Sequence, residues 1–183
     1  MNPPFIINQP TIGIPEAVAP QIWTTLVEAD HEFLPPLSQR GSGTQTTFSP
    51  VQATQSTGPV AYFDSIRHQD LLTACLGSAP DTVAGFMSYR PESHLPDTAN
   101  QQTYHYVTTV VVHPAFRGHR LTQQLYEKLL ATAYPLHQGV ATRTWSTNTA
   151  HMRLLHRLGF TPVHRIPDDR GPGIDTVYFA KDI

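Results

Sequence analysis

The chain of 183 residues is short of charged side chains and has a single cysteine. Lysine, arginine, aspartate and glutamate together make up 14% of it, and the formal net charge is −2. Because no block of like charge stands out, the sequence lacks the basic footprint of a nucleic-acid-binding protein. Cys75 alone cannot form an internal disulfide, so nothing indicates an oxidising, secretory environment.

Long hydrophobic runs are also missing. No apolar stretch approaches the roughly 20 residues that a membrane-spanning helix needs, and Met1–Phe5 lacks the basic end and apolar centre of a signal peptide. We therefore expect a soluble, cytoplasmic protein without a membrane partner. With 39% hydrophobic residues, the length favours a single domain over residues 1–183.

Several motifs of enzyme chemistry are absent from the sequence. There is no Gly-x-Ser-x-Gly elbow, no Walker loop and no dinucleotide-binding glycine pattern. Ten histidines raise the question of a metal, but His151 and His156 are about 140° apart around a helix, and His113 and His119 have no cysteine or carboxylate at ligand spacing. We expect no metal, and we expect Cys75, inside an apolar run, to be a buried structural thiol.

Hydrophobic periodicity predicts alternating helices and strands. Apolar residues at helical spacing indicate helices at about 15–34 (regular only from Pro20), 59–68, 119–133 and 148–158. Runs rich in β-branched, aromatic or apolar residues indicate strands at 5–7, 71–76, 83–89, 103–112, 140–145, 160–164 and 175–180. Residues 38–58 and 91–102 are expected to be long polar loops. This order of elements predicts an α/β fold with a mixed sheet.

The segment Val110–Thr122 carries the strongest chemical signal. A β-branched run meets a short turn, and a leucine-striped helix starts at once, which places Arg117, His119 and Arg120 around a helix N-terminus. Such an end already carries roughly half a positive charge, and the first acidic residue after it is Glu127. The cations are understandable if an anion, such as a phosphate, binds the N–H groups there. A solvated basic turn without function is the alternative.

The order of elements and this turn resemble the GNAT acetyltransferases, which move an acetyl group from acetyl-CoA to an amine. The family's turn reads Gln/Arg-x-x-Gly-x-Gly/Ala, and it aligns here with Arg117-Gly118-His119-Arg120-Leu121-Thr122, preceded by Val112-His113-Pro114. Arg120 and Thr122 stand where the family has small residues. Both keep their N–H groups and are allowed in helical conformations, so we expect the phosphate cradle to persist, with Arg120 adding a charge-assisted bond.

A second motif lies further along the chain. Asn148 and the run Leu155–Phe160 resemble the family's Asn-x6-Leu-Tyr-x-x-Gly-Phe, with His156 in place of the tyrosine. By this resemblance Asn148 hydrogen-bonds the pantetheine arm of the cofactor. A helix cap at Asn148 and a helix stop at Gly159 would explain the same residues without function.

The resemblance implies a GNAT-like fold of α/β class, with a central, mostly antiparallel sheet of about seven strands flanked by about four helices. It also implies acetyl-CoA bound along the strand that ends at Val112, where backbone N–H groups would stabilise the thioester oxygen. The residues expected to bind the cofactor are Val110, Val111, Val112, Arg117, Gly118, His119, Arg120, Leu121, Thr122, Gln123 and Asn148.

Two histidines are the candidates for proton transfer. An imidazolium with a pKa of about 6.5 can protonate a thiolate whose acid has a pKa of about 8.5, so His156 is expected to act as the general acid. The alternative is a cation beside Arg157 that favours the helix dipole. His105, acting through water, is our hypothesis for the base, against a strand histidine that is merely packed or exposed. Tyr104 and Tyr106 are expected to be core or cleft wall.

Three functions are compatible with these residues. The leading one is an N-acetyltransferase that moves the acetyl group of acetyl-CoA directly to a primary amine of a small molecule or peptide. The amine would bind between the first two helices with their loop 38–58 and the C-terminal hairpin loop near Asp168-Asp169. That acidic pair would attract an amine, or it is simply solvated. The second is a non-catalytic acyl-CoA-binding module, and the third a protein whose turn binds another phosphate, such as a nucleotide. A C-terminal strand would be available to pair across a homodimer.

Overall fold

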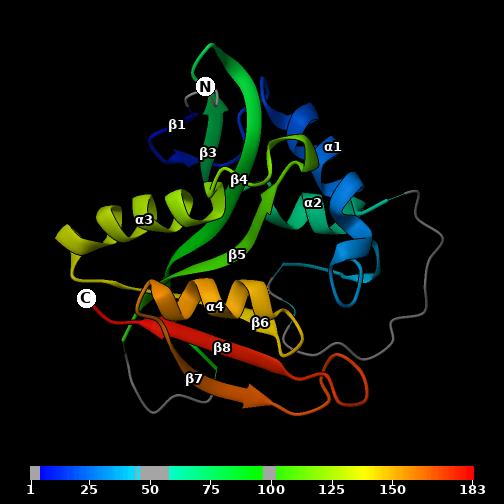
Figure 1. The fold of residues 1–183 in the computed structure, drawn as a ribbon, viewed down its shortest axis with the longest axis vertical. Coiled ribbons are helices and arrows are strands. Elements are labelled where there is room, and N and C mark those ends of the chain that lie inside the picture. The colour runs from blue at the N-terminus through cyan, green and yellow to red at the C-terminus, as the bar shows by residue number, and fades with distance from the viewer. Residues whose placement is uncertain (1–4, 44, 46–57, 97–101) are drawn as a thin grey trace. The chain divides into compact units, whose positions relative to one another are not determined.

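The computed structural model describes residues 5–43, 45, 58–96 and 102–183, so the predicted loops 38–58 and 91–102 lie partly outside the described residues. Figure 1 shows the described helices α1 (Ala19–Ala29), α2 (Val60–Ile66), α3 (Leu121–Ala133) and α4 (Thr149–Arg157). The strands are β1 (Phe5–Ile7), β2 (Thr11–Ile12), β3 (Asp70–Leu76), β4 (Ala79–Ser93), β5 (Tyr104–Val112), β6 (Gly139–Trp145), β7 (Thr161–Ile166) and β8 (Thr176–Lys181). Short 3-10 turns are η1 (Asp30–Glu32), η2 (Leu37–Gln39), η3 (Pro114–Phe116) and η4 (Tyr134–Leu136).

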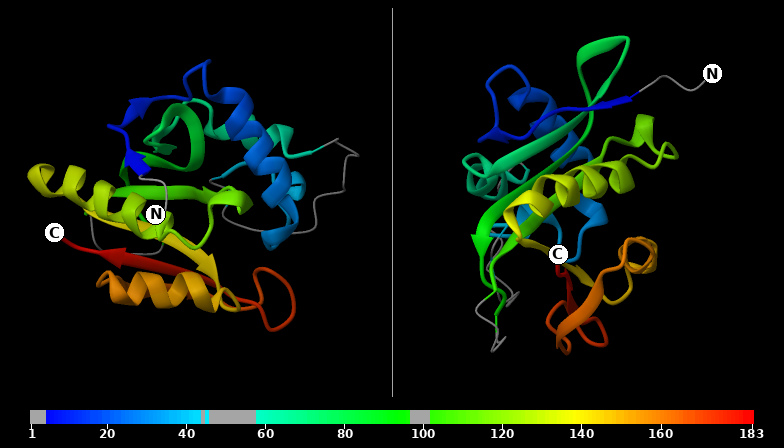
Figure 2. Two further views of the ribbon diagram at one scale, coloured as in Figure 1. Left: turned by 45° about the horizontal axis from the view of Figure 1, so that its top comes forward. Right: turned by 90° about the vertical axis from the view of Figure 1, so that its left-hand side faces the viewer.

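The described strands form one eight-stranded sheet in the order β1-β3-β4-β5-β6-β8-β7, with β2 also paired to β3. The printed pairs are antiparallel except for β5 and β6, which run parallel. Figure 2 shows β3 and β4 as a long, curved hairpin. The prediction of a mixed, mostly antiparallel sheet with helices is therefore confirmed.

Three details of the predicted elements were wrong. Strand β4 runs from Ala79 to Ser93 rather than over 83–89, so part of the predicted loop 91–102 continues the strand. Helix α3 begins at Leu121 rather than at 119, because the residue before it has a left-handed backbone. The last strand, β8, lies between β6 and β7 and is hydrogen-bonded on both sides, so it has no open edge for pairing across a homodimer.

The chain divides into two compact units. The first comprises Met1–Tyr89 and Thr108–Tyr126, and the second comprises Arg90–Val107 and Glu127–Ile183. Three elements, β4, β5 and α3, contribute residues to both units. The single domain over residues 1–183 stays a prediction.

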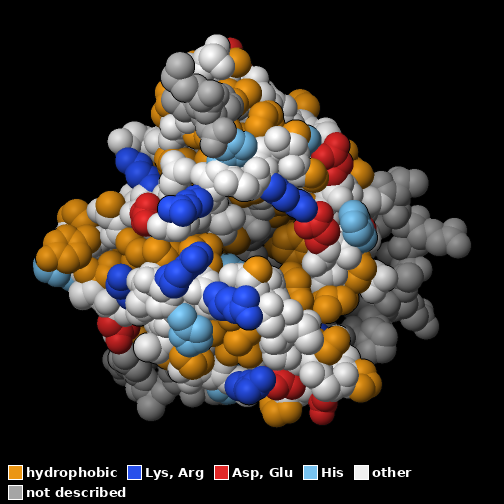
Figure 3. All heavy atoms as spheres, viewed as in Figure 1, with side chains coloured by type: hydrophobic (Ala, Val, Ile, Leu, Met, Phe, Trp, Pro, Cys, Tyr) orange, Lys and Arg blue, Asp and Glu red, His pale blue; other side chains and the backbone are white. Residues whose placement is uncertain are grey.

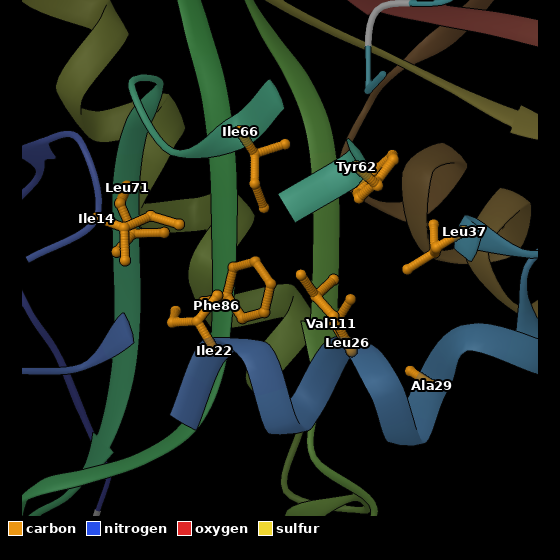
Figure 4. Close-up of a cluster of buried hydrophobic side chains, with 10 residues drawn as sticks. All are labelled: Ile14, Ile22, Leu26, Ala29, Leu37, Tyr62, Ile66, Leu71, Phe86 and Val111. Atoms are coloured by element: carbon orange, nitrogen blue, oxygen red, sulfur yellow. The ribbon is translucent and has the colours of Figure 1, made fainter. Parts of the chain in front are cut away.

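The first unit has a core in which α1 packs against strands. Figure 4 shows Ile22, Leu26 and Ala29 on one face of α1, close to Phe86 of β4 and Val111 of β5. The helical spacing of these apolar residues is what the sequence predicts, and Pro20 is accommodated in the first turn, where its missing N–H has no helical partner. The buried members of this cluster are Ile14, Ile22, Leu26, Ala29, Leu37, Tyr62, Ile66, Leu71, Phe86 and Val111.

The second unit has a separate core formed by Leu95 and by residues of β5, β6 and β8. Its buried members are Leu95, Tyr104, Tyr106, Ala141, Tyr178 and Ala180. Helix α4 runs along β8 (Figure 1), and the ring of His156 meets Phe179 edge to face at a centroid distance of 5.2 Å. The helix ends as predicted at Gly159, which has a φ of 84°. Lys181 Nζ donates to the carbonyl of Leu158 at 2.8 Å and satisfies one of the last helical acceptors.

Candidate active site

The segment from β5 to α3 forms a tight turn at the end of a strand. Val111 is buried in the core of the first unit, while Val110 and Val112 are partly exposed. The parallel pairing with β6 covers Tyr104–Val107 of β5, so the end of the strand that leads into the turn lies beyond it. The strand, turn and helix predicted from the sequence are therefore present in that order.

The turn contains two residues with a left-handed backbone. Gly118 has a φ of 82° and Arg120 a φ of 57°. We expected Arg120 to adopt a helical conformation, and this was wrong. The left-handed region is unstrained for glycine but crowds the Cβ of other residues, which gives a physical reason for a glycine at this position of the family's turn. The exposed Arg120 keeps the glycine-like backbone at some cost in strain.

The first amides of α3 have no hydrogen-bond partner within the helix. Gln124 N donates to the carbonyl of Arg120 at 3.1 Å, and the helix geometry leaves the amides of Leu121 and Thr122 ahead of that bond without a partner in the helix. The side chain of Gln124 also donates to the carbonyl of His119 at 3.0 Å. A helix start of this kind is suited to binding an anion.

Two acidic residues from a distant part of the chain lie against this turn. Arg117 binds both carboxylate oxygens of Glu32, at 2.8 and 2.9 Å, and its Nε donates to the carbonyl of Val112 at 3.2 Å. His113 Nε2 lies 3.0 Å from a carboxylate oxygen of Glu28. Glu127 is the first acid after the turn along the chain, but the fold brings two earlier acids to it, and a pair 85 residues apart cannot be seen in a local reading of the sequence. The role of Arg117 in binding cofactor stays a prediction.

The other two basic residues of the turn, His119 and Arg120, differ in their surroundings. His119 is partly buried, with Nδ1 at 3.1 Å from the carbonyl of Phe116 and its ring 5.0 Å from that of Phe5 on β1. Arg120 is exposed and forms no ion pair with another of the described residues. The binding of a phosphate by the Arg120 guanidinium stays a prediction.

Asn148 occupies the N-cap of α4 in the second unit. Its Oδ1 accepts a hydrogen bond from the amide of His151 at 3.3 Å, which is the capping role that the sequence allowed as the alternative. Since the cap uses the side-chain oxygen, the amide Nδ2 group is the part of Asn148 that can donate to a pantetheine carbonyl. That contact stays a prediction.

The two predicted proton-transfer histidines differ in exposure. His156 is exposed in the last turn of α4, with its ring against Phe179. His105 is only 4% exposed on β5, so a proton from a substrate would reach it only through an intervening group or water. Tyr104 and Tyr106 are buried as expected, and burial, together with a hydrogen bond to Asp182, raises the pKa of Tyr104 to about 12.

A cluster of polar side chains around Thr108 was not predicted from the sequence. The Thr108 hydroxyl lies 3.0 Å from that of Ser88 and also bonds the side-chain oxygen of Gln69. Tyr62 on α2 bonds the hydroxyl of the neighbouring Thr109 at 2.7 Å. Ser88 and Tyr62 are fully buried, whereas Thr108 is partly exposed. The only sequence signal is that these polar residues interrupt apolar strand patterns.

The acidic pair Asp168-Asp169, in the loop before β8, forms hydrogen bonds with groups of the same segment. Asp168 accepts from the amide of Gly173 at 2.5 Å, and Asp169 accepts from the hydroxyl of Thr176 at 2.5 Å. Each carboxylate thus accepts one hydrogen bond within the loop through one of its two oxygens. Attraction of an amine by this pair stays a prediction. The loop is held in shape by its own acids, with Asp168 at a φ of 53°.

Other predicted side chains behave as structural residues. Cys75 is buried, and Asn8 donates to its Sγ at 3.4 Å, as expected of a structural thiol. In the described part of the chain, no group of three or more histidine, cysteine or acidic side chains is arranged to hold a metal ion. On the face drawn in Figure 3, charged side chains are interspersed with neutral polar and hydrophobic ones. None of the described helices is both long and apolar enough to cross a membrane.

The chain is similar to a known protein family in sequence and to solved proteins in structure. A sequence model of the acetyltransferase (GNAT) family matches residues 43–160. No curated protein matches the chain in sequence. An N-acetyltransferase from Staphylococcus aureus Mu50 is similar in structure, with a TM-score of 0.65, 14% identity and 98% of each chain covered.

Two further similar structures were determined with ligands. The yncA protein from Salmonella typhimurium, determined with its cofactor acetyl-CoA, has a TM-score of 0.62 and 18% identity over 98% of this chain and 94% of that one. NAA60 from Arabidopsis thaliana, in complex with a bisubstrate analogue, has a TM-score of 0.64 and 16% identity over 98% of each chain. At these identities the structural likeness shows a shared fold.

Proposed function

Because this chain belongs to the acetyltransferase (GNAT) family, we propose that it moves the acetyl group of acetyl-CoA directly to a primary amine of a small molecule or peptide. The observation that carries this proposal is the turn between β5 and α3, where left-handed Gly118 and Arg120 precede a helix start. Alternating backbone conformations of this kind turn successive N–H groups toward one point, which suits a diphosphate.

The proposed cofactor site uses mainly backbone groups. The amides between Gly118 and Gln123 would hold the diphosphate, and the exposed Arg120 guanidinium would add a charge-assisted bond. The pantetheine arm would follow the backbone of Val110, Val111 and Val112, and Asn148 would donate to it. A strand N–H at this position would stabilise the oxyanion that develops on the thioester carbonyl.

The reaction itself requires a neutral amine and a protonated thiol product. The amine nitrogen attacks the carbonyl carbon, the carbon–sulfur bond breaks, the amine loses a proton and the thiolate of CoA gains one. The exposed His156 is our proposal for the group that protonates the thiolate. For the base we keep His105 acting through water, which its 4% exposure makes necessary.

The test of the proposed function joins binding to turnover. Calorimetry of the protein with CoA and, separately, with ATP should show heat of association with CoA alone. Free thiol should then be released from acetyl-CoA when a panel of small amines and peptides with free N-termini is added, and not without them. Absence of CoA binding would sink the proposal, and equal binding of ATP would point to a general phosphate site.

His156 can be tested by replacement with phenylalanine, which keeps an aromatic ring against Phe179. Loss of a general acid typically lowers turnover by about 10²-fold or more, while the dissociation constant for CoA should stay within about twofold. Steady-state turnover and calorimetry on the same preparation separate the two effects. An unchanged turnover number would remove His156 from the mechanism.

A non-catalytic acyl-CoA-binding module is the second candidate. Two features favour it. His105 is buried, which keeps it from direct contact with a substrate amine, and Arg120 places a strained backbone in the cofactor turn. This alternative predicts CoA binding of ordinary strength with no thiol release across the whole amine panel. The enzyme predicts release with at least one amine class.

A further inference from the structure

The turn that we propose to hold the diphosphate contains a strained backbone conformation. Gly118 adopts its left-handed backbone freely, but Arg120, with a φ of 57°, does not. A non-glycine residue in this region persists only where the surrounding structure holds it there. The question is therefore which contacts keep this turn in its shape.

Two carboxylates on the first helical segment face the turn. Glu28 on α1 and Glu32 on η1 are four residues apart, a spacing that places side chains on one helix face. They meet His113 and Arg117, which are also four apart, at 3.0 Å and at 2.8 and 2.9 Å. We call these four side chains the carboxylate ladder. The amide of Ala115 donates to His113 Nδ1, so Nε2 is the nitrogen that carries a hydrogen toward Glu28.

Arg117 connects the ladder to the backbone that leads into the strained turn. Its Nε donates to the carbonyl of Val112, the last residue of β5, at 3.2 Å. In sequence it directly precedes Gly118. When Glu32 fixes the guanidinium, the chain is therefore held at the end of the strand and at the entry to the left-handed segment.

An exposed ion pair usually contributes little to stability, so its contribution depends on the geometry of the contact. Arg117 and Glu32 are 44% and 38% exposed. One guanidinium nitrogen, Nη2, contacts both oxygens of Glu32 at 2.8 and 2.9 Å, while Nε donates to the carbonyl of Val112. The guanidinium is therefore fixed by three contacts, although this is not the two-nitrogen fork of the strongest arginine–carboxylate pairs. The same unit offers a contrast in Arg67 and Glu16, which share one contact at 3.3 Å and are 43% and 90% exposed. That second pair is the matched control.

We propose that Glu32 is a positioning residue for acetyl-CoA, supported by Glu28. It acts through Arg117, holding the strained turn in the conformation that presents its amides to the diphosphate. This inference rests on the proposed function, in which the turn between β5 and α3 binds acetyl-CoA. It also assigns Arg117 to support of the turn rather than to direct contact with phosphate.

The test is Glu32→Gln, which keeps the size of the side chain and removes its charge. Removing a negative charge near an anion site would by itself tighten binding, so the direction of the change is diagnostic. We expect the dissociation constant for CoA, measured by calorimetry, to rise about three- to fivefold, and hydrogen exchange of the amides in 118–122 of the free protein to accelerate. Glu16→Gln should change neither.

A second substitution separates positioning from other effects. Arg120→Gly removes the strain, so in that background Glu32→Gln should weaken CoA binding by less than about twofold. The proposal is overturned if Glu32→Gln tightens or leaves binding unchanged, or if its effect is as large beside Arg120→Gly as alone. If the unaltered protein does not bind CoA, the proposed function fails, whereas exchange of the turn amides in the free protein still decides whether the ladder holds the turn.

Discussion

At the scale of single residues, Arg120 is where this chain departs most clearly from its family. We expect Arg120→Gly to be about 0.5–1 kcal/mol more stable than Arg120→Ala, because both remove the guanidinium but only glycine relieves the left-handed backbone. Both variants should bind CoA more weakly than the unaltered chain through loss of the same charge. Urea unfolding and calorimetry of the pair measure the two effects separately.

Two outcomes for these variants would contradict the prediction. Equal stability of Arg120→Gly and Arg120→Ala would mean that the turn relaxes at little cost, and the strain argument would be withdrawn. Unchanged CoA affinity in both would remove Arg120 from the cofactor site while leaving the amides as its ligands.

His151 on α4 gives the chain a pH-dependent stability. Burial lowers the pKa of this histidine from 6.5 to about 4, so below pH 6.5 the unfolded chain takes up a proton that the folded chain refuses. Stability contributed by the neutral side chain is therefore lost as the pH falls from 6.5 toward 4. At pH 5 the loss is at most about 2 kcal/mol, at about 1.4 kcal/mol for each pKa unit.

Replacement of His151 by glutamine tests this dependence. The urea midpoint of the unaltered chain should fall between pH 7 and pH 5, and the fall should be smaller in His151→Gln. The exposed His68 is the control, since His68→Gln should keep the full pH dependence. A pH dependence identical in all three proteins would exclude His151 as its source.

Some residues of the candidate site could be predicted from sequence, and others could not. The basic residues of the turn and Asn148 stand next to strong local signals, a strand end and a helix start. Glu28 and Glu32 carry no such signal, because their meaning comes from partners 85 residues away. The left-handed backbone of Arg120 was missed for a different reason, because nothing in the residue type requires it.

At the scale of elements, Gly85 of β4 lets the neighbouring strand approach closely. A Cβ at this position would lie 2.9 Å from the carbonyl oxygen of Val111 and 3.2 Å from the Cα of Val112. We expect Gly85→Ala to destabilise the protein by about 1–3 kcal/mol, because backbone atoms cannot move aside cheaply. It should also weaken CoA binding, since the displaced strand is the proposed path of the pantetheine arm.

Gly41→Ala is the control for this substitution. A Cβ at Gly41 would meet only the side-chain oxygen of Gln45, at 3.8 Å, which is an ordinary contact. Urea unfolding and calorimetry on both variants give the result. If Gly85→Ala unfolds at the same urea concentration as Gly41→Ala, the close approach does not constrain the strand.

The elements with strong periodicity were predicted best. Helix α1 follows the spacing of Ile22, Leu26 and Ala29, and α4 is bounded by its cap and its glycine, as expected. The two-residue β2 and the 3-10 turns were missed, because segments this short have no period to detect. The position of β8 inside the sheet was missed because strand order depends on pairing between distant segments.

At the scale of the whole molecule, the order of elements predicted the mixed sheet and resemblance predicted the fold. The family model covers residues 43–160, and the two motifs on which the resemblance rested both lie within that range. The described residues also form two compact units, a division that composition and length did not indicate. Charge is spread thinly over the chain, so no residue cluster marked a boundary between them.

The ten histidines of the chain allow a last prediction about metal. In the described ranges they do not combine with acids or Cys75 into a group of three that could hold an ion, and the acetyl transfer as proposed relies on backbone hydrogen bonds and on proton transfer by histidines. We expect dialysis against EDTA to leave both turnover and the urea midpoint unchanged, and zinc added back to have no activating effect. A loss of turnover with EDTA that zinc restores would mean that ligands from residues beyond those described complete a metal site, and the proton transfers assigned to His156 and His105 would have to be reconsidered.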